Sequence, residues 1–227
     1  MSQPKKPFAW SYSKLKNFET CPLKHKSYDI DKIVVEGKSE ALEYGNAVHK
    51  ALADAIGKGV PLPAAMSYSL QPWVEKVRSG PGALMVEQQY AITADFNKCT
   101  WFSPSAWFRG IGDVVRINDT VALVLDWKTG KIVEDIVQLA LMAQCLFVHY
   151  PDVQAVRSEF VWLAHDCTTS EVYTRSKMVD MWPGLFERVG VMKQAWDTGV
   201  YPPKPSGLCV RHCGVTSCEF HGKGTRG

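Results

Sequence analysis

The pattern of apolar and polar positions is clearest at residues 121–125, five apolar residues that Asp126 and Lys128 follow. Such a run predicts a buried β-strand. Because the side chains of a strand alternate between its two faces, the carboxylate of Asp126 and the ammonium of Lys128 point the same way. Thr129 and Gly130 then predict a turn. An acid and a base presented together at a strand end suit metal-assisted chemistry.

A second strand is predicted upstream, at residues 109–117, with a hairpin turn at Asn118 and Asp119. Pairing of the two strands brings Asp113 beside Asp126. An isolated Asp-x-Lys commonly caps an exposed strand end and pairs weakly, which is a purely structural interpretation. Here both acids belong to apolar strands, and unpaired buried charges are expensive, so a bound divalent cation that offsets their charge is the alternative.

Other segments show helical spacing or strand-like runs. Helices are predicted at residues 11–20, 39–56, 64–77, 134–150 and 178–198, and further strands at 84–93, 156–164 and 171–175. Gly45 and His49 lie one turn apart on a predicted helix, so the missing side chain of Gly45 leaves space above the imidazole. We expect His49 to project into a pocket, although a single histidine is more commonly a core or surface residue.

The composition is that of an ordinary globular protein, with 227 residues of which 46% are hydrophobic and 22% charged. No apolar stretch approaches the roughly 20 residues that a membrane helix requires. Residues 1–6 lack the apolar centre of a secretory signal. We therefore expect a cytoplasmic protein without a membrane partner.

The positive charge is concentrated near the amino terminus, although the net charge is only +3. Before Asp29, six lysines face one acid, Glu19. They alternate with aromatic residues, so the segment offers phosphate contacts and stacking surfaces for unpaired bases. A solvated face with a few core aromatics explains the pattern equally well. The lysines are Lys5, Lys6, Lys14, Lys16, Lys24 and Lys26, and the aromatic residues are Phe8, Trp10, Tyr12 and Phe18.

Seven cysteines in a chain without export features indicate metal ligation or buried thiols rather than disulfides. Three of them, Cys99, Cys145 and Cys167, are most simply buried or loop thiols. The other four lie near the two ends of the chain, at Cys21, Cys209, Cys213 and Cys218.

Five motifs follow one another along the chain. They are Ser11-x-Ser13-x-Leu15-x-x-Phe18-x-x-Cys21-Pro22, Gly45-x-x-x-His49, Gly112-Asp113, Asp126-Trp127-Lys128-Thr129-Gly130 and Gln138-Leu139-Ala140-Leu141-Met142-Ala143. Together they resemble the RecB-type branch of the PD-(D/E)xK nuclease superfamily, which includes CRISPR-adaptation exonucleases and phage recombination exonucleases. The resemblance implies an α/β, restriction-endonuclease-like core at residues 39–200, in which helices flank a central mixed β-sheet.

The resemblance also implies the roles of the site residues. His49, Asp113, Asp126 and the main-chain carbonyl of Trp127 would ligate Mg²⁺ or Mn²⁺, ions that suit oxygen ligands and, for manganese, an imidazole. Asp113 and Asp126 would thereby be catalytic, and Lys128 would orient or deprotonate the attacking water.

The helix after the strand would contribute Gln138 to the same site. Gln138 resembles a glutamine with which the family supports its active site. Met142 stands where relatives have a tyrosine, which leaves the polar contribution of this helix open.

In many relatives a cysteine of the first helix and three near the carboxyl terminus hold a [4Fe-4S] cluster that staples the two ends together. By resemblance, Cys21 in the amino-terminal segment 1–38 would join Cys209, Cys213 and Cys218 in the cysteine-rich tail 201–227. The usual tail spacing is C-x-x-C-x-x-x-x-x-C, whereas here the middle cysteine is shifted by one. His212 and His221 are competing ligands, so a tetrahedral Zn²⁺ site is the alternative.

These expectations combine into a metal-dependent DNA nuclease that acts as an exonuclease on single-stranded DNA or duplex ends. It would serve recombination, repair or phage DNA metabolism in the cytoplasm, or the host cytoplasm if phage-encoded, with a helicase or recombinase as partner. The alternative is a non-catalytic nucleic-acid-binding module with the same fold and a structural metal centre. A zinc-stapled interaction protein is a third interpretation.

Overall fold

The computed structural model describes residues 7–34, 37, 39–133 and 135–223. The chain divides into two compact units. We call residues 39–181 the sheet unit, and residues 1–38 together with 182–227 the terminal unit. The terminal unit thus contains both predicted end segments and also residues 182–200, which the sequence assigned to the core.

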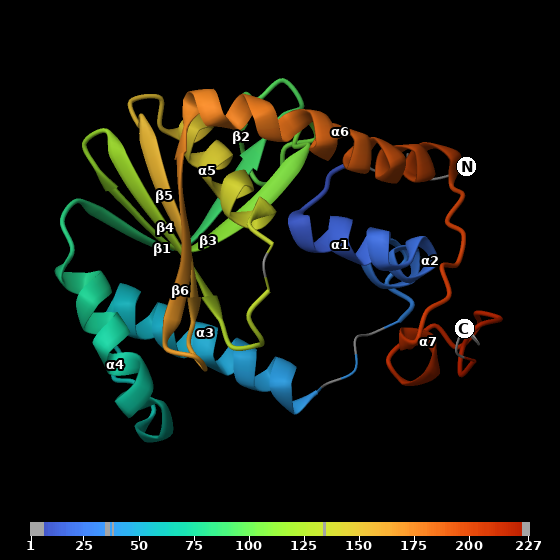
Figure 1. The fold of residues 1–227 in the computed structure, drawn as a ribbon, viewed down its shortest axis with the longest axis horizontal. Helices are drawn as coiled ribbons and strands as arrows, with labels where there is room; N and C mark the ends of the chain where they lie inside the picture. Colours follow the sequence, from blue (N-terminus) through green and yellow to red (C-terminus); the bar gives the residue numbers. More distant parts are fainter. Residues whose placement is uncertain (1–6, 35–36, 38, 134, 224–227) are drawn as a thin grey trace. The chain divides into compact units, whose positions relative to one another are not determined.

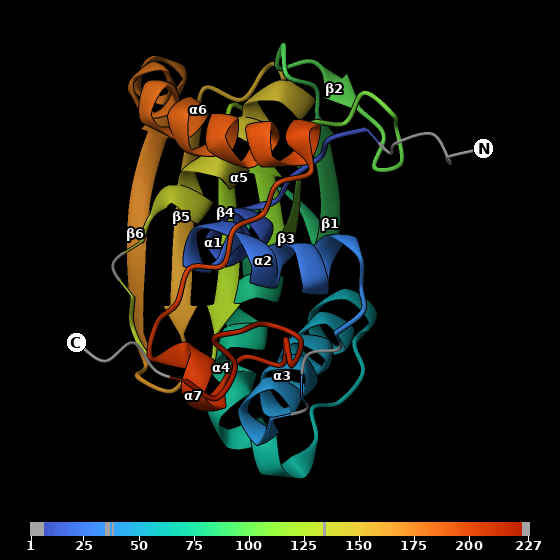
Figure 2. The same ribbon diagram turned by 90° about the vertical axis from the view of Figure 1, so that its right-hand side faces the viewer.

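The sheet unit is built on one six-stranded sheet of order β2-β1-β3-β4-β5-β6, which Figure 2 shows strand by strand. Strands β4 and β5 are parallel and the other neighbours antiparallel, so the predicted mixed sheet is confirmed. The parallel pair needs a crossover, which α5 (Val137–His149) supplies. The strands are β1 (Ala83–Ile92), β2 (Lys98–Cys99), β3 (Phe108–Asn118), β4 (Val121–Lys128), β5 (Ala155–Trp162) and β6 (Cys167–Thr174).

Helices cover both faces of this sheet. Helices α3 (Glu40–Lys58) and α4 (Ala64–Ser79) lie on one face and α5 on the other (Figure 1). Ser39 begins α3 as its N-cap, with the side chain accepting a hydrogen bond from the Leu42 amide at 3.2 Å. The core on the α3 side includes Leu52 and Trp127, which are at most 2% exposed. Helices therefore flank a central mixed sheet, as the sequence predicted.

A buried arginine fixes the end of α4 against the sheet. The Arg116 guanidinium, on β3, donates hydrogen bonds to the carbonyls of Val77 and Arg78, the last turn of α4, and to those of Pro81 and Gly82. Carbonyls at a helix end have no partner within the helix, so one cation satisfies several of them.

The terminal unit is small and mostly helical. Its elements are α1 (Tyr12–Thr20), α2 (Pro22–His25), the π-helical turn η1 (Lys26–Ile30), the second part of α6 (Arg175–Thr198) and α7 (Leu208–Arg211). Arg188 of α6 donates two hydrogen bonds to the Glu19 carboxylate of α1, at 2.6 and 3.0 Å. This fork joins the amino-terminal segment to the second part of α6.

The structure corrects one hypothesis about the amino-terminal aromatic residues. Trp10 and Phe18 are 1% and 5% exposed, so their rings cannot stack on unpaired bases. For these two residues the core interpretation is correct. Phosphate binding by the lysines stays a prediction.

Most predicted elements begin and end within a few residues of the observed ones. Strand β6 is the main exception, because it begins at Cys167, inside the predicted turn. The turn between β5 and β6 is therefore tighter than expected, and it contains Asp166 in a left-handed conformation with a φ of 46°. The sequence did not predict β2, α2, η1 or α7, which have two to five residues each. None of the helices in the described part of the chain is long and apolar enough to span a membrane.

Candidate active site

The site begins at an irregularity in the β1–β3 ladder. Val86 pairs with Val114 and Gln88 with Gly112, but Glu87 and Asp113 between them do not pair. Glu87 has a φ of 51°, in the left-handed region that costs a non-glycine residue about 1–3 kcal/mol. Such strain persists only where the surrounding structure enforces it, which marks this position as a functional candidate.

The two acids of this irregularity meet a histidine from α3. One ligand atom of each of His49, Glu87 and Asp113 lies within 4.8 Å of the others. The His49 Nδ1 atom is 3.4 Å from Asp113 Oδ2, and Asp113 is buried whereas Glu87 is exposed. Within the described residues this is the one trio of histidine, cysteine or acidic side chains spaced to share an ion.

The sequence placed Asp126 and Trp127 at this site as well. Val114 pairs with Leu125, so the next position along the two strands sets Asp113 opposite Asp126. The Trp127 amide donates a hydrogen bond to Asp113 Oδ2 at 2.8 Å, and the Trp127 backbone also hydrogen-bonds with His49. Asp126 is close by but does not belong to the trio, because its carboxylate is directed to Lys128.

Lys128 is held by three neighbours. Its ammonium forms an ion pair with Asp126 and donates a hydrogen bond to Gln138 Oε1 at 3.1 Å. It also lies 4.8 Å from the centre of the Phe160 ring. Gln138 comes from the first turn of α5, directly after β4, so the strand and its crossover helix together fix the lysine.

The carboxylates of the site carry more negative charge than their neighbours compensate. Burial raises the pKa of Asp126 to about 6, and the charge of Asp113 adds to this against the opposing effect of Lys128. Burial and the Asp113 charge also raise the pKa of Glu87. The hydrogen bond with Asp113 raises the pKa of His49, although burial opposes it. A bound cation would offset this excess charge.

A cleft opens beside the trio. It has a volume of about 700 Å³ and is lined by His49 and Glu87, by Thr129, and by the exposed face of α3. That face carries Lys50 and Lys58, which both form ion pairs with Asp54 and lower its pKa to about 2. The cleft thus places two ammonium groups, each paired with Asp54, next to the acids of the site.

Two glycine motifs have packing explanations. A Cβ on Gly45 would lie 3.1 Å from the Thr129 hydroxyl, so the space above His49 is occupied by Thr129. A Cβ on Gly110 or Gly112 would meet Met142 of α5, at 2.8 Å from the sulfur and 3.3 Å from the methyl carbon respectively. Met142 is buried against the sheet, so this helix contributes apolar packing where relatives have a tyrosine.

Glu87 is the site residue that the sequence did not single out. Its strand alternates weakly, and the acid stands among Val86, Gln88 and Gln89 without any recognisable spacing. Only the register of β1 against β3 could have identified Glu87, because antiparallel pairing of these strands sets it opposite Asp113.

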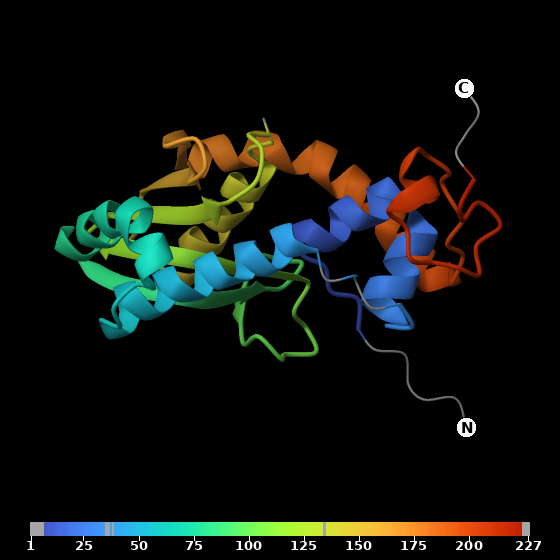
Figure 3. The ribbon, with the colours of Figure 1, turned by 90° about the horizontal axis from the view of Figure 1, so that it is seen from below.

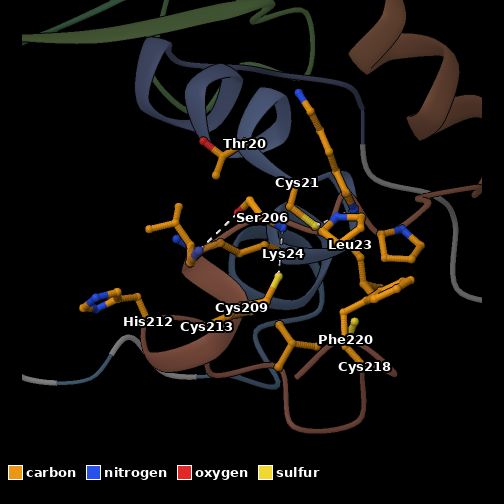
Figure 4. A pocket seen from close by; sticks show the side chains of 15 residues that line it. Thr20, Cys21, Leu23, Lys24, Ser206, Cys209, His212, Cys213, Cys218 and Phe220 are labelled. Atoms are coloured by element: carbon orange, nitrogen blue, oxygen red, sulfur yellow. Dashed lines mark hydrogen bonds between the residues drawn. The ribbon is translucent and has the colours of Figure 1, made fainter. Parts of the chain in front are cut away.

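The four end cysteines line one cavity of the terminal unit, as Figure 4 shows. The amide of Lys204 donates a hydrogen bond to the Cys21 sulfur at 3.3 Å, and the amide of Ser206 donates one to the Cys209 sulfur at 3.4 Å. Amide donors stabilise the negative charge of a thiolate, the form that binds metal. His212 also lines the cavity, whereas His221 is not among its lining residues.

Comparison with known proteins bears on the family and the fold. The sequence matches the model of the PD-(D/E)XK nuclease superfamily over residues 9–219. A crystal structure from Eubacterium rectale, described as "Putative exonuclease", superposes with a TM-score of 0.56 at 12% identity and covers 90% of this chain and 86% of its own. At this identity the likeness concerns the fold alone.

A second solved structure, SSO0001, aligns over 93% of this chain and 86% of its own, at 12% identity. Its TM-score of 0.37 is too low to support an argument. No curated protein matches the sequence. Because the family model covers most of the sequence, the chain belongs to the PD-(D/E)XK nuclease superfamily.

Proposed function

We propose that the protein is a Mg²⁺- or Mn²⁺-dependent deoxyribonuclease that hydrolyses phosphodiester bonds. The observation that carries the proposal is the convergence of His49, Glu87 and Asp113 beside the Asp126–Lys128 pair, at the edge of a cleft. Paired acids with a neighbouring ammonium are the groups that this hydrolysis requires.

The ligands of the ion would be His49, Glu87, Asp113 and Asp126, with the carbonyl of Trp127 as a further donor. The excess negative charge of these residues fits a divalent cation. Four oxygen donors and one imidazole suit magnesium or manganese better than softer metals. When bound, the ion supplies an activated water and neutralises charge on the phosphoryl oxygens.

Lys128 would act on the attacking water. Asp126 and Gln138 hold its ammonium at the end of β4, so it can donate hydrogen bonds to a water or to a phosphoryl oxygen at a fixed position. In that position it orients the nucleophile and counters the negative charge that develops in the transition state.

The substrate would be single-stranded DNA or the end of a duplex, cleaved exonucleolytically. The resemblance to recombination exonucleases and the description of the Eubacterium rectale protein support this choice. Lys50 and Lys58 line the cleft as contacts for successive phosphates. The enzyme would serve recombination, repair or phage DNA metabolism. A helicase or recombinase would deliver the DNA.

The competing function is a nucleic-acid-binding module without catalysis. It needs ammonium groups that contact phosphates but has no use for three clustered carboxylates, where burial and the charge of Asp113 raise the pKa values of Glu87 and Asp126. Such acids repel a polyanion unless a bound cation neutralises their charge. The site therefore favours the enzyme.

The test is hydrolysis of end-labelled single-stranded and duplex DNA, with chelator and with added Mg²⁺ or Mn²⁺. We expect activity only with metal, and its loss in Asp113→Asn and Glu87→Gln. Asp119→Asn is the matched control, because it makes the same change in the turn of the same hairpin, outside the site. Full activity of Asp113→Asn, or activity that resists the chelator, contradicts the proposal. Metal-independent binding without hydrolysis favours the module.

We further propose that Cys21, Cys209, Cys213 and Cys218 hold a structural metal centre, a [4Fe-4S] cluster rather than Zn²⁺. Around a tetrahedral zinc ion with Zn–S bonds of about 2.3 Å, the sulfurs lie about 3.8 Å apart. No three of these thiols lie within 4.8 Å of one another in the described residues, so they do not form a zinc site as they stand. The cysteine pattern shared with relatives supports the cluster. The centre would tie a tail with little core of its own to α1 and α2.

Elemental analysis and visible absorption of anaerobically purified protein distinguish iron from zinc. Cys209→Ser is expected to remove the metal and lower the thermal midpoint, while Cys167→Ser, outside the cavity, changes neither. Protein that contains neither metal, with all four thiols freely alkylated, contradicts the proposal.

A further inference from the structure

The segment that joins β1 to β3 carries an unusual set of side chains. Residues 96–109, which we call the aromatic loop, include most of this connection and the first two residues of β3, and they contain five aromatic residues and two cations. One acid, Asp95, directly precedes them. The aromatic residues are Phe96, Trp101, Phe102, Trp107 and Phe108, and the cations are Lys98 and Arg109. Apart from the short strand β2 and the first two residues of β3, the segment extends away from the sheet as a loop (Figure 3).

Part of this aromatic surface faces solvent. Phe102 is 88% exposed, more than any other large hydrophobic side chain of the described residues except Tyr68. Arg109 lies 5.9 Å from the centre of the Trp101 ring, and its Nε donates a hydrogen bond of 2.7 Å to the Trp101 carbonyl. The guanidinium therefore fixes Trp101 next to the exposed ring.

The aromatic loop is continuous with the metal site along one face of the hairpin. Gly110 and Gly112 face Met142 of α5, so Arg109 and Ile111, which alternate with them, face the opposite side, as Asp113 does. Ile111 and its cross-strand partner Gln89 are exposed. Four residues at about 3.3 Å each place Arg109 about 13 Å from Asp113.

We propose that the aromatic loop binds the unpaired strand of a DNA substrate, with bases stacked on Trp101 and Phe102 and phosphates near Lys98. This inference rests on the proposed function, because it assigns a substrate contact to the same site. Solvent-facing rings beside cations match the chemistry of unpaired nucleotides, which offer flat bases and a polyanionic backbone. At the 3.4 Å spacing of a stacked strand, the separation of about 13 Å corresponds to about four nucleotides from the cleaved bond.

The test measures binding of a fluorescent oligothymidylate of about ten nucleotides, within the range of one single-strand binding site. The Asp113→Asn background prevents consumption of the DNA. Phe102→Ala is expected to weaken binding between about 5-fold and about 150-fold, the usual range for one stacked base. Phe102→Trp should restore it. Lys98→Ala should reduce the slope of log affinity against log salt by about 0.7.

Tyr68→Ala is the matched control, because Tyr68 is 97% exposed but lies on α4, outside the loop. Hydrolysis of bis(p-nitrophenyl) phosphate, a substrate without bases, tests the metal site independently of the loop in proteins that retain Asp113. Phe102→Ala should leave the rate of this hydrolysis unchanged. Equal DNA affinity of Phe102→Ala and Tyr68→Ala overturns the inference and leaves the nuclease assignment intact. Loop-dependent binding by a chain that never hydrolyses DNA supports the inference and contradicts the proposed function.

Discussion

The role of Gln138 gives the sharpest test of how the lysine is positioned. The glutamine accepts a hydrogen bond from Lys128 at 3.1 Å and belongs to a different element, the crossover helix α5. If it acts only through Lys128, its removal matters only while that lysine is present.

The magnitude follows from the hydrogen bond. A hydrogen bond to a charged group contributes about 1.5–3 kcal/mol, and Lys128 keeps its ion pair with Asp126 when the glutamine is lost. We therefore expect Gln138→Ala to lower kcat/KM by about 10- to 100-fold. Removing the lysine itself should cost about 100- to 10,000-fold, as for a group that handles the nucleophile's proton. The double variant should lose no more than Lys128→Ala alone.

The assay is kcat/KM on end-labelled single-stranded DNA at saturating Mn²⁺, with thermal midpoints to confirm folding. Gln138→Glu retains an acceptor oxygen and should restore most of the activity. Gln144→Ala removes another glutamine of α5 and should leave kcat/KM unchanged. If the losses of Gln138→Ala and Lys128→Ala multiply in the double variant, the glutamine acts independently of the lysine and the reasoning is wrong.

Three predictions concern stability. Arg116→Met should lower the free energy of unfolding by about 3 kcal/mol, because several buried carbonyls lose a charged donor, and urea denaturation measures this loss. Gly110→Ala should cost about 1–3 kcal/mol through overpacking, and adding Met142→Ala should recover part of it; unchanged stability of Gly110→Ala would contradict the contact. Burial raises the pKa of Asp29, but hydrogen bonds from His25 and Asn17 outweigh it, so the net pKa is lowered. The stability that Asp29 contributes is therefore full above pH 4 and is lost as the pH falls through the lowered pKa. Asp29→Asn should make the thermal midpoint depend less on pH below about pH 4.

Much of the sheet unit was predictable because its sequence signals are local. The apolar run before Asp126 and the turn at Asp119, whose φ is 52°, determined the β3–β4 hairpin. Ser39 marked the start of α3, and its side chain indeed caps the helix. These signals depend on neighbouring residues alone, so the tertiary fold does not override them.

The residues that escaped prediction depend on contacts distant in sequence. Glu87 becomes part of the site only through the register of β1 against β3 and through an unfavourable backbone conformation, which no local pattern favours. The hypothesis of stacking by Trp10 and Phe18 failed for the same reason, because the sequence does not reveal which aromatic side chains are buried. The exposed ring of Phe102 lies in a segment for which the pattern predicted neither a helix nor a strand.

The two faces of the β1–β3 hairpin explain why rigidity and chemistry coexist in one element. On one face, Gly110 and Gly112 let Met142 approach the backbone closely, so the hairpin is fixed against α5 by packing. The other face carries Glu87 and Asp113, where the ladder is interrupted and the acids stay close despite their charge. Packing on the first face therefore offsets the strain and repulsion on the second, and the acids stay in place for a cation.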